Sequence, residues 1–264
     1  NNPWERACAR VAKSMNQQPQ VTGFMHCAVL LSHPKIIITE KEKTVRPRPQ
    51  KLVCTGPRAR DIMIQYGGHS PEETVPGCAL RHEYLWQLQP REHVNRKVQN
   101  ILVALDGLPT MPGLIKFVLN ALNSESSYRA VLRPHPIDTP ERVMADAGIP
   151  MSALHNVTFS HSESIARDLD EADLLIYQGS TVALEAGYLG IPLIHLDPKN
   201  LLNNDPLFEV SSLKKVATTP DELVAAVQGF STMSTEEYLK ERSELVEYIS
   251  QYLVKPTIDY TDIF

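Results

Sequence analysis

The sequence predicts an α/β protein built on doubly wound parallel sheets. From residue 98 onward, short apolar runs that suit strands buried on both faces alternate with helix-forming segments. The segment Ala172–Asp197 holds a complete β-α-β unit, in which a Gly-Ser-Thr turn joins an apolar run to a helix and a second apolar run follows. Strands and helices that alternate at this spacing form a parallel sheet with right-handed crossovers.

The first part of the chain is expected to hold only part of a doubly wound domain. It has too few strands for a complete nucleotide-binding fold, so we expect the earlier strands to be absent or to lie elsewhere. Residues 41–49 are charged and proline-rich, which predicts a solvated loop. The expected elements are a helix over 4–15, strands at 21–24, 51–55 and 75–80, and a helix over 59–66.

A polar stretch, residues 86–97, contains Pro90 and is expected to link two domains. We therefore divide the chain into a partial Rossmann-like domain with its linker, residues 1–92, and a second Rossmann-like domain, residues 93–264. The second domain is expected to contain strands at 98–105, 128–132, 157–159, 174–177, 193–196 and 216–217, and helices at 114–122, 141–147, 162–172, 182–189, 220–227 and 235–253.

Composition restricts the class of protein. A chain of 264 residues is long enough for two modest α/β domains, and it has no apolar run of the ~18–20 residues that a membrane span requires. Its four cysteines form no C-x-x-C pair, which predicts reduced thiols, a cytoplasmic location and no zinc site. A net charge of −5 gives no overall attraction to nucleic acid. The chain begins at Asn1 without a methionine, so we expect either a longer parent protein or a chain that has been trimmed.

The turn of the β-α-β unit is a candidate phosphate site. Gly179, Ser180 and Thr181 place two hydroxyls and several amides at a helix start, where negative charge is favoured. Glu185 lies one turn further along, on about the same face as Thr181, and its carboxylate can accept hydrogen bonds from sugar hydroxyls. The alternative is a serine-capped helix in an ordinary α/β protein.

The run G-S-T-V-A-L-E-A-G-Y-L-G-I-P-L-I resembles the donor-nucleotide signature in the C-terminal domain of GT-B glycosyltransferases. The resemblance implies that Ser180 and Thr181 hold a phosphate and that Glu185 holds the ribose. In the first domain N-P-W-E-R, C-T-G-P-R-A-R-D and G-C-A-L-R-H-E-Y-L resemble, more loosely, the N-terminal domain of bacterial surface-polysaccharide glycosyltransferases. Members of that family more often carry Gln-His where this chain has Met25-His26.

The second motif is Arg133-Pro134-His135-Pro136, at the end of a predicted strand. The prolines stiffen the exit of the strand, arginine offers a fork suited to phosphate oxygens, and His135 can donate to a leaving phosphate or act as an acid. The motif resembles the His-Pro motif of transferases that use CMP-activated sugars and of CDP-glycerol glycerophosphotransferases. The alternative is a rigid turn whose histidine caps a helix.

Other candidates are weaker. Asp106-Gly107 follows a strand and either approaches substrate or caps a helix; His161 and Ser162 lie in a strand-end loop that could touch the base. Asp168-Leu169-Asp170 has the spelling of a metal-binding motif, but positions two apart on a helix point to different sides, so we reject it. In the first domain, two residues are candidates for the active-site cleft. His26 is either a general base or a structural histidine, and Arg81 is the other candidate.

The resemblance implies a metal-independent GT-B glycosyltransferase that needs no cofactor and transfers a sugar from a CMP- or NDP-sugar to a surface polysaccharide, such as a capsular or lipid-linked glycan. Two alternatives stay open: a nucleotide-sugar 2-epimerase of GT-B fold, and a non-catalytic domain that binds nucleotide or a partner. The basic segment 41–51 either contacts anionic lipid or glycan, which implies peripheral attachment at the inner face of a membrane, or is simply solvated.

Overall fold

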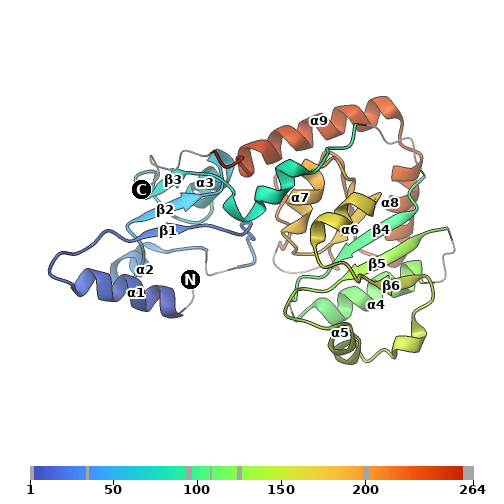
Figure 1. Cartoon of the computed structure of the whole chain (residues 1–264), viewed down its shortest axis with the longest axis horizontal. Coiled ribbons are helices and arrows are strands. Elements are labelled where there is room, and N and C mark those ends of the chain that lie inside the picture. Colours follow the sequence, from blue (N-terminus) through green and yellow to red (C-terminus); the bar gives the residue numbers. More distant parts are fainter. Residues whose placement is uncertain are drawn as a thin grey trace. The chain divides into compact units, whose positions relative to one another are not determined.

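The computed structural model describes residues 3–33, 36–92, 97–107, 109–123, 127–198 and 203–257. They form an α/β protein with one three-stranded and one six-stranded sheet, in both of which the paired strands are parallel (Figure 1). The chain divides into two compact units: unit 1 is Asn1–Trp86 with Tyr248–Phe264, and unit 2 is Gln87–Glu247. The division thus lies before the expected position at residues 92 and 93, and the end of the C-terminal helix belongs to unit 1.

Unit 1 is a small parallel sheet with helices between its strands. The strands lie in the order β1-β2-β3, which is also their order along the chain. In β2 the last two residues, Val53 and Cys54, are buried, whereas the residues of the edge strand β1 are exposed or half-buried. The elements are α1 (Pro3–Ser14), β1 (Thr22–Phe24), α2 (Glu40–Val45), β2 (Lys51–Cys54), α3 (Pro57–Gln65), β3 (Thr74–Pro76) and the 3-10 helix η1 (Leu80–Gln87).

The expectation of a loop over residues 41–49 is wrong for its first half, because α2 occupies Glu40–Val45. Thr39 and Glu42 form a capping box: the Thr39 hydroxyl accepts from the Glu42 amide, and the Glu42 carboxylate accepts from the Thr39 amide at 3.0 Å. This reciprocal pair satisfies amides that the first turn leaves unbonded. The T-x-x-E spacing signals the helix start despite the charged composition.

The last turn of α9 (Thr235–Tyr252) completes unit 1. The Val29 amide donates to the buried Tyr252 hydroxyl at 2.7 Å, and the Thr55 hydroxyl donates to the Tyr252 carbonyl at 2.8 Å. The Ala79 amide donates to the Val254 carbonyl at 2.9 Å. Residues near the C-terminal end are therefore structural parts of the first unit.

Unit 2 is a doubly wound domain. Its strands lie in the order β6-β5-β4-β7-β8-β9, so the chain builds outward from β4 in one direction and then returns to add β7 on the other side. The strands are β4 (Asn100–Ala104), β5 (Arg129–Arg133), β6 (Val157–Phe159), β7 (Leu174–Tyr177), β8 (Leu193–Leu196) and β9 (Lys214–Ala217).

Helices cover the central strands. α4 contacts both α5 and α8, whereas α6 packs on β4, and α7 packs on β7 and β8. β7 and β8 are completely buried, as strands of a parallel sheet covered on both faces should be. The helices are α4 (Met111–Leu122), α5 (Pro140–Ala147), α6 (Ile165–Glu171), α7 (Val182–Tyr188) and α8 (Pro220–Ser231), with a 3-10 turn, η2, at Met151–Ala153.

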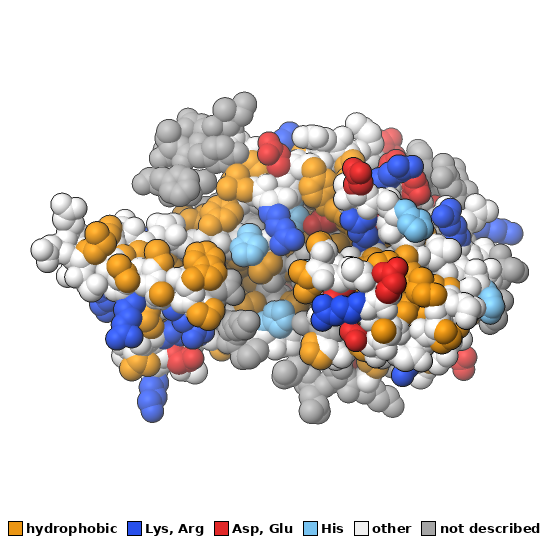
Figure 2. Space-filling model, turned by 60° about the horizontal axis from the view of Figure 1, so that its bottom comes forward, with side chains coloured by type: hydrophobic (Ala, Val, Ile, Leu, Met, Phe, Trp, Pro, Cys, Tyr) orange, Lys and Arg blue, Asp and Glu red, His pale blue; other side chains and the backbone are white. Residues whose placement is uncertain are grey.

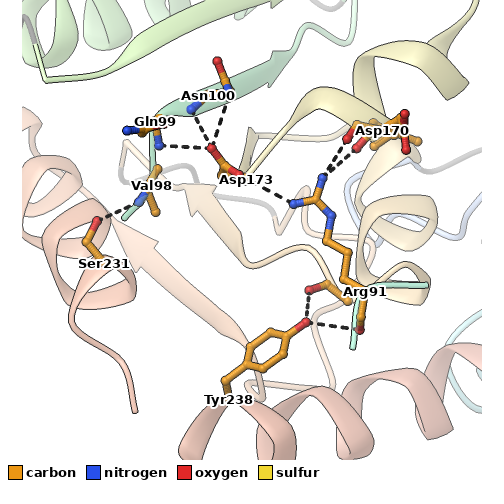
Figure 3. Close-up of polar contacts among 10 residues, drawn as sticks. Arg91, Val98, Gln99, Asn100, Asp170, Asp173, Ser231 and Tyr238 are labelled. Atoms are coloured by element: carbon orange, nitrogen blue, oxygen red, sulfur yellow. Dashed lines mark hydrogen bonds and ion pairs between the residues drawn. The ribbon is translucent and has the colours of Figure 1, made fainter. Parts of the chain in front are cut away.

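Arg91, in the expected linker, is bound to the rest of unit 2 (Figure 3). The Arg91 guanidinium donates to the carbonyl of Asp170 at 3.0 Å and lies 3.8 Å from the Asp173 carboxylate. Asp173 in turn accepts from the Gln99 and Asn100 amides, at 3.1 and 2.9 Å, where β4 begins. These contacts join the end of α6 to the starts of β4 and β7.

Gly190, at the end of α7, permits a close approach of α9. Its φ is +77°, and a Cβ there would lie 3.0 Å from the Tyr238 hydroxyl and 2.8 Å from Nε of Arg242. The Tyr238 hydroxyl donates to the Gly190 carbonyl at 2.9 Å. Only glycine fits this conformation and this space together.

Among the described residues, no helix is both long and apolar enough to span a bilayer.

Candidate functional site

The carboxyl edge of the six-stranded sheet brings the sequence motifs of unit 2 together. Asp106 and Gly107 follow β4, His135 follows β5, and Gly179 follows β7. β4 is the central strand at which the direction of chain winding reverses, between β5 and β7. Open α/β sheets bind ligands outside the carboxyl ends of their strands at this switch point.

Asp106 ties the β4 loop to the β7 loop. Its carboxylate accepts from the Gly179 amide at 3.2 Å. The sequence left open whether Asp106 caps a helix, but the residue at the N-cap of α4 is Thr110. Asp106 therefore orients the Gly-Ser-Thr turn instead.

Gly107 is packed against His135. Its φ is +67°, and a Cβ there would lie 3.2 Å from both Cβ and Cγ of His135. Only glycine combines this left-handed conformation with so close a neighbour at low energy. The β4 and β5 loops are thus in contact at the switch point.

His135 is half-exposed and held by its own turn. The Ile137 amide donates to Nδ1 at 3.4 Å, and the Asp138 amide donates to the His135 carbonyl at 2.8 Å. With Nδ1 as an acceptor, the neutral ring carries its proton on Nε2. The neutral histidine can therefore donate one hydrogen bond from Nε2.

The Gly-Ser-Thr turn is compact. Ser180 is 8% exposed, and its hydroxyl accepts from the Val182 amide at 3.4 Å. Thr181 is half-exposed at the N-cap of α7, and its side chain makes no capping hydrogen bond. Glu185 is buried in the first turn of α7, at 6% exposure. Thr181 is thus the more accessible of the two hydroxyl residues.

Arg133 makes three contacts within unit 2 through one nitrogen. Nη1 donates to the Ser162 carbonyl, to the Ser160 hydroxyl at 3.2 Å and to the buried Asp168 carboxylate at 2.9 Å. The Ser160 hydroxyl also donates to Asp168 at 2.8 Å. The arginine thereby holds the β6 loop, which carries the exposed His161 and the half-buried Ser162.

Asp168 and Asp170 face different sides of α6, as expected. Asp168 is buried against Arg133, whereas Asp170 is exposed. Within the described ranges, no group of three or more histidine, cysteine, aspartate or glutamate side chains could hold a metal ion.

A pocket of about 190 Å³ lies between α6 and the sheet. Its lining includes Asn100 and Leu102 of β4, Arg129 and Val131 of β5, and Arg167 of α6. It shares Ser160, His161 and Ser162 with the β6 loop but includes none of Asp106, His135 and Ser180. This pocket is therefore an alternative place for a ligand to bind, and an experiment can distinguish it from the carboxyl edge.

Unit 1 holds the two remaining candidates, His26 and Arg81. His26 follows β1 and is exposed, next to Cys27. Burial raises the pKa of the Cys27 thiol, and the positive charge of Arg81 partly offsets that rise. Arg81, in η1, is exposed as well.

Sequence reasoning missed a buried polar network beside β7. The Tyr177 hydroxyl donates to Asp205 at 2.8 Å, and Asp205 pairs with the Lys214 ammonium at 2.6 Å. Burial and the Asp205 charge raise the pKa of Tyr177 well above its usual value. The His195 ring lies 5.3 Å from the Tyr177 ring, between centroids. The available signal in the sequence was the presence of a tyrosine and a histidine in two otherwise apolar strands. The sequence near them gave no indication that Asp205 would be their partner.

Gln178, directly before Gly179, was also missed. It is 1% exposed, and neither atom of its amide has a hydrogen-bond partner among the described residues. A polar residue directly after the apolar run of β7 was the available signal.

The fold is shared with solved glycosyltransferases. A structure of the wall teichoic acid polymerase TagF superposes with a TM-score of 0.55 at 13% identity, over 90% of this chain and 65% of that chain. TarM superposes with a TM-score of 0.53 at 11% identity, over 91% of this chain and 49% of that chain. A protein assigned as a UDP-N-acetylglucosamine 2-epimerase from Listeria monocytogenes superposes with a TM-score of 0.53 at 15% identity, over 86% of this chain and 62% of that chain.

The chain has a GT-B-like fold. Two Rossmann-like units with parallel sheets of three and six strands confirm the predicted α/β class, including the small first sheet. The chain spans less than two thirds of each of these three structures. No protein-family model and no curated protein sequence matches it.

Proposed function

We propose that this chain is a glycosyltransferase that moves a sugar from a nucleotide-activated donor to a glycan acceptor. The observation that carries the proposal is the meeting of Asp106, Gly107, His135 and Gly179 at the carboxyl edge, around the switch point of the sheet. The fold shared with TagF and TarM supports a transferase at the level of architecture.

In this proposal the Gly-Ser-Thr turn holds the donor phosphates. The Ser180 and Thr181 hydroxyls, with nearby amides, supply hydrogen bonds to phosphate oxygens. Glu185 accepts from the ribose hydroxyls, and His161 and Ser162 lie on the side of the base. Asp106 keeps the turn in place through the Gly179 amide.

His135 stabilises the departing nucleotide. Its Nε2–H donates to the phosphate as negative charge develops there, which lowers the barrier by electrostatic stabilisation without a metal ion. The Arg133 charge is already balanced by Asp168, so its role here is to position the β6 loop. His135 is thus the side chain assigned to the departing phosphate, beside the hydroxyls and amides of the Gly-Ser-Thr turn.

The acceptor side is assigned to unit 1. His26 serves as the general base for an acceptor hydroxyl, and Arg81 attracts an anionic part of the acceptor. The acceptor class is a bacterial surface polysaccharide such as a capsular or lipid-linked glycan, built at the cytoplasmic side of a membrane. The donor is a CMP- or NDP-sugar, which the Arg-Pro-His-Pro motif favours.

A thermal-shift panel with CMP, CDP, UDP, GDP and dTDP tests the donor site. A nucleotide at 100 times its dissociation constant stabilises the fold by about 2.7 kcal/mol, which a melting curve resolves. We expect a shift with one nucleotide that His135→Ala and Glu185→Gln each reduce. The matched controls, His155→Ala and Glu236→Ala, replace exposed side chains away from the edge and should keep the shift. No shift with any nucleotide would leave a non-catalytic partner-binding domain.

A nucleotide-sugar 2-epimerase is the second candidate, because a protein assigned to that class has the same fold. The two reactions differ in their need for an acceptor. A transferase consumes donor only when acceptor is present, whereas an epimerase converts the sugar nucleotide alone. Chromatography of the donor after incubation with and without acceptor glycan distinguishes them.

A further inference from the structure

The pocket between α6 and the sheet is open because α6 covers only part of that face. The helix has seven residues and packs on β4. The floor of the pocket is a block of paired strand residues, with Asn100 opposite Arg129 and Leu102 opposite Val131. Leu102 is 2% exposed, whereas Val131 is half-buried and Arg129 is exposed. The floor is therefore covered on the side of β4 and open on the side of β5.

Helix α6 supplies charged side chains to the wall of this pocket. Arg167 and Glu171, one turn apart, both line it, and their side chains are 74% and 63% exposed. Nε of Arg167 lies 3.4 Å from the Glu171 carboxylate, and an exposed ion pair of this kind contributes little stability. Both groups can therefore exchange this contact for a ligand at low cost.

Arg129 adds a positive charge that is not neutralised. Among the described residues, its guanidinium makes no hydrogen bond and no ion pair. The nearby carboxylates have partners of their own: Asp168 pairs with Arg133 at 2.9 Å, and Asp173 lies 3.8 Å from the Arg91 guanidinium. Within the described part of the pocket lining, Arg129 is thus the cation left to pair with a ligand.

The attraction for an anion is local to the pocket. Figure 2 shows Lys and Arg side chains interleaved with Asp and Glu side chains on the side of the view that holds unit 2. The net charge of the chain is −5. Selectivity for an anion must therefore come from the two guanidinium groups at the floor and wall, whose planar forks match the oxygens of a carboxylate or a phosphate.

The same pocket offers acceptors for hydroxyl groups and an apolar surface. Nδ2 of Asn100 donates to Asp173 at 3.4 Å, which leaves the side-chain oxygen of Asn100 without a partner among the described residues. The Glu171 carboxylate is a second acceptor. Leu102 and Val131 form an apolar patch between these polar groups, and the volume of about 190 Å³ suits a molecule of monosaccharide size.

We propose that this pocket binds a hydroxylated organic anion of monosaccharide size, such as a sugar or polyol that carries one carboxylate or one phosphate. Arg129 and Arg167 hold the anionic group through paired N–H bonds. Asn100 and Glu171 accept hydrogen bonds from hydroxyl groups, and the apolar floor contacts the carbon skeleton. Binding sites for small polar molecules combine an apolar surface with a few placed polar groups in this way.

This site is separate from the carboxyl edge of the sheet. Arg129 begins β5, whereas His135 lies beyond Arg133, the last residue of that strand. The five residues of β5 span about 13 Å, at ~3.3 Å for each step along a parallel strand. A molecule of monosaccharide size held by Arg129 therefore does not reach His135. The proposal does not depend on the donor site.

Calorimetric titration of the full chain tests the pocket without nucleotide, so its failure and that of the proposed reaction are separable. The probes are glucuronate, glucose 6-phosphate, glucose and acetate. We expect at least one of the two anionic sugars to bind about tenfold more tightly than both glucose and acetate. Glucose lacks the charge, and acetate lacks the ring and its hydroxyls. Which anionic sugar binds identifies the ligand as a carboxylate or a phosphate.

Substitutions of Arg129 test the residue that carries the proposal. Arg129→Gln should weaken binding of the anionic sugar about tenfold, and Arg129→Lys should restore part of it, because lysine keeps the charge but not the planar fork. The matched control, Lys116→Gln, removes an exposed cation of α4 that does not line the pocket and should bind as the parent does. Since Arg129 is exposed, its loss should leave the melting temperature nearly unchanged.

Hydrogen exchange locates the bound anion. The anionic sugar that binds most tightly should slow exchange in residues 100–102, 129–131 and 165–172 and leave residues 135–138 unchanged. The proposal is overturned if neither anionic sugar binds more tightly than glucose and acetate, or if Arg129→Gln binds as tightly as Lys116→Gln. Protection of residues 135–138 in place of the pocket would also overturn it.

Discussion

Gly107 and Gly148 have nearly the same backbone conformation and different neighbours. Their φ angles are +67° and +66°, but a Cβ would meet His135 at 3.2 Å in the first case and nothing within 4 Å in the second. We expect Gly107→Ala and Gly148→Ala each to lose about 1–2 kcal/mol of stability from the left-handed conformation. Only Gly107→Ala should also displace His135 and weaken nucleotide binding, as measured by calorimetry. Equal nucleotide affinities in the two variants would show that Gly107 does not support the binding site.

His195 makes stability depend on pH. Burial lowers its pKa from 6.5, an effect that outweighs the nearby Asp205 and Asp197 carboxylates, while the Lys214 ammonium lowers it further. At a pH just below 6.5, His195 is therefore protonated in the unfolded chain but stays neutral in the folded protein. The stability contribution is full above that pH and is lost as the pH falls through 6.5 toward the folded pKa.

Melting temperatures between pH 8 and pH 5 check this effect. The parent should lose more stability on acidification than His195→Asn. Part of the loss should persist in that variant, because burial lowers the pKa of His69 in the same direction. Parallel curves for the parent and the variant would show that His195 does not carry the effect.

At the scale of elements, the Arg133–Asp168 ion pair joins β5 to α6 and the β6 loop. Removing one partner of a buried pair costs about 3–5 kcal/mol, and this figure is an upper bound here because Arg133 is only partly buried. We expect Asp168→Ala to lose about 1–3 kcal/mol in chemical denaturation and the exposed Asp170→Ala to lose less than about 0.5 kcal/mol. Similar losses for both variants would contradict the role given to the pair.

The elements of unit 2 were predictable because each depends on local signals. The apolar run of β7, the Gly-Ser-Thr turn and the stop at Gly190 define a β-α-β unit without tertiary information. α2 was missed because its charged, proline-flanked composition outweighed the Thr39–Glu42 capping box.

Long-range pairings could not be predicted in the same way. Asp205 reaches Tyr177 and Lys214 only when β7, β8 and β9 are side by side. The partner of Arg133 was likewise invisible, because the sequence gives the charge of Asp168 but not the face of α6 that meets β5. The candidate site was therefore predictable as a set of loops, and the contacts among its residues were not.

At the scale of the whole molecule, α9 makes a tyrosine hydroxyl hydrogen bond in each unit. The Tyr238 hydroxyl donates to Gly190 in unit 2, and the Tyr252 hydroxyl accepts from Val29 in unit 1. Tyr→Phe removes one buried hydrogen bond and leaves a partner unsatisfied, which costs about 1–3 kcal/mol.

Hydrogen exchange can assign each loss to its unit. Tyr252→Phe should speed exchange in residues 22–85, and Tyr238→Phe should speed exchange in residues 98–231. If both variants loosen the whole chain equally, the two units unfold as one and the division does not hold.

The central claim is that a donor nucleotide binds at the carboxyl edge of the six-stranded sheet. Hydrogen exchange with and without the nucleotide that gives the largest thermal shift tests it most directly. We predict slower exchange in residues 105–107, 135–138 and 178–184, which contain Gly107, His135 and the Gly-Ser-Thr turn. Protection confined to residues 100–102, 129–131 and 165–172, around the pocket under α6, would contradict the account.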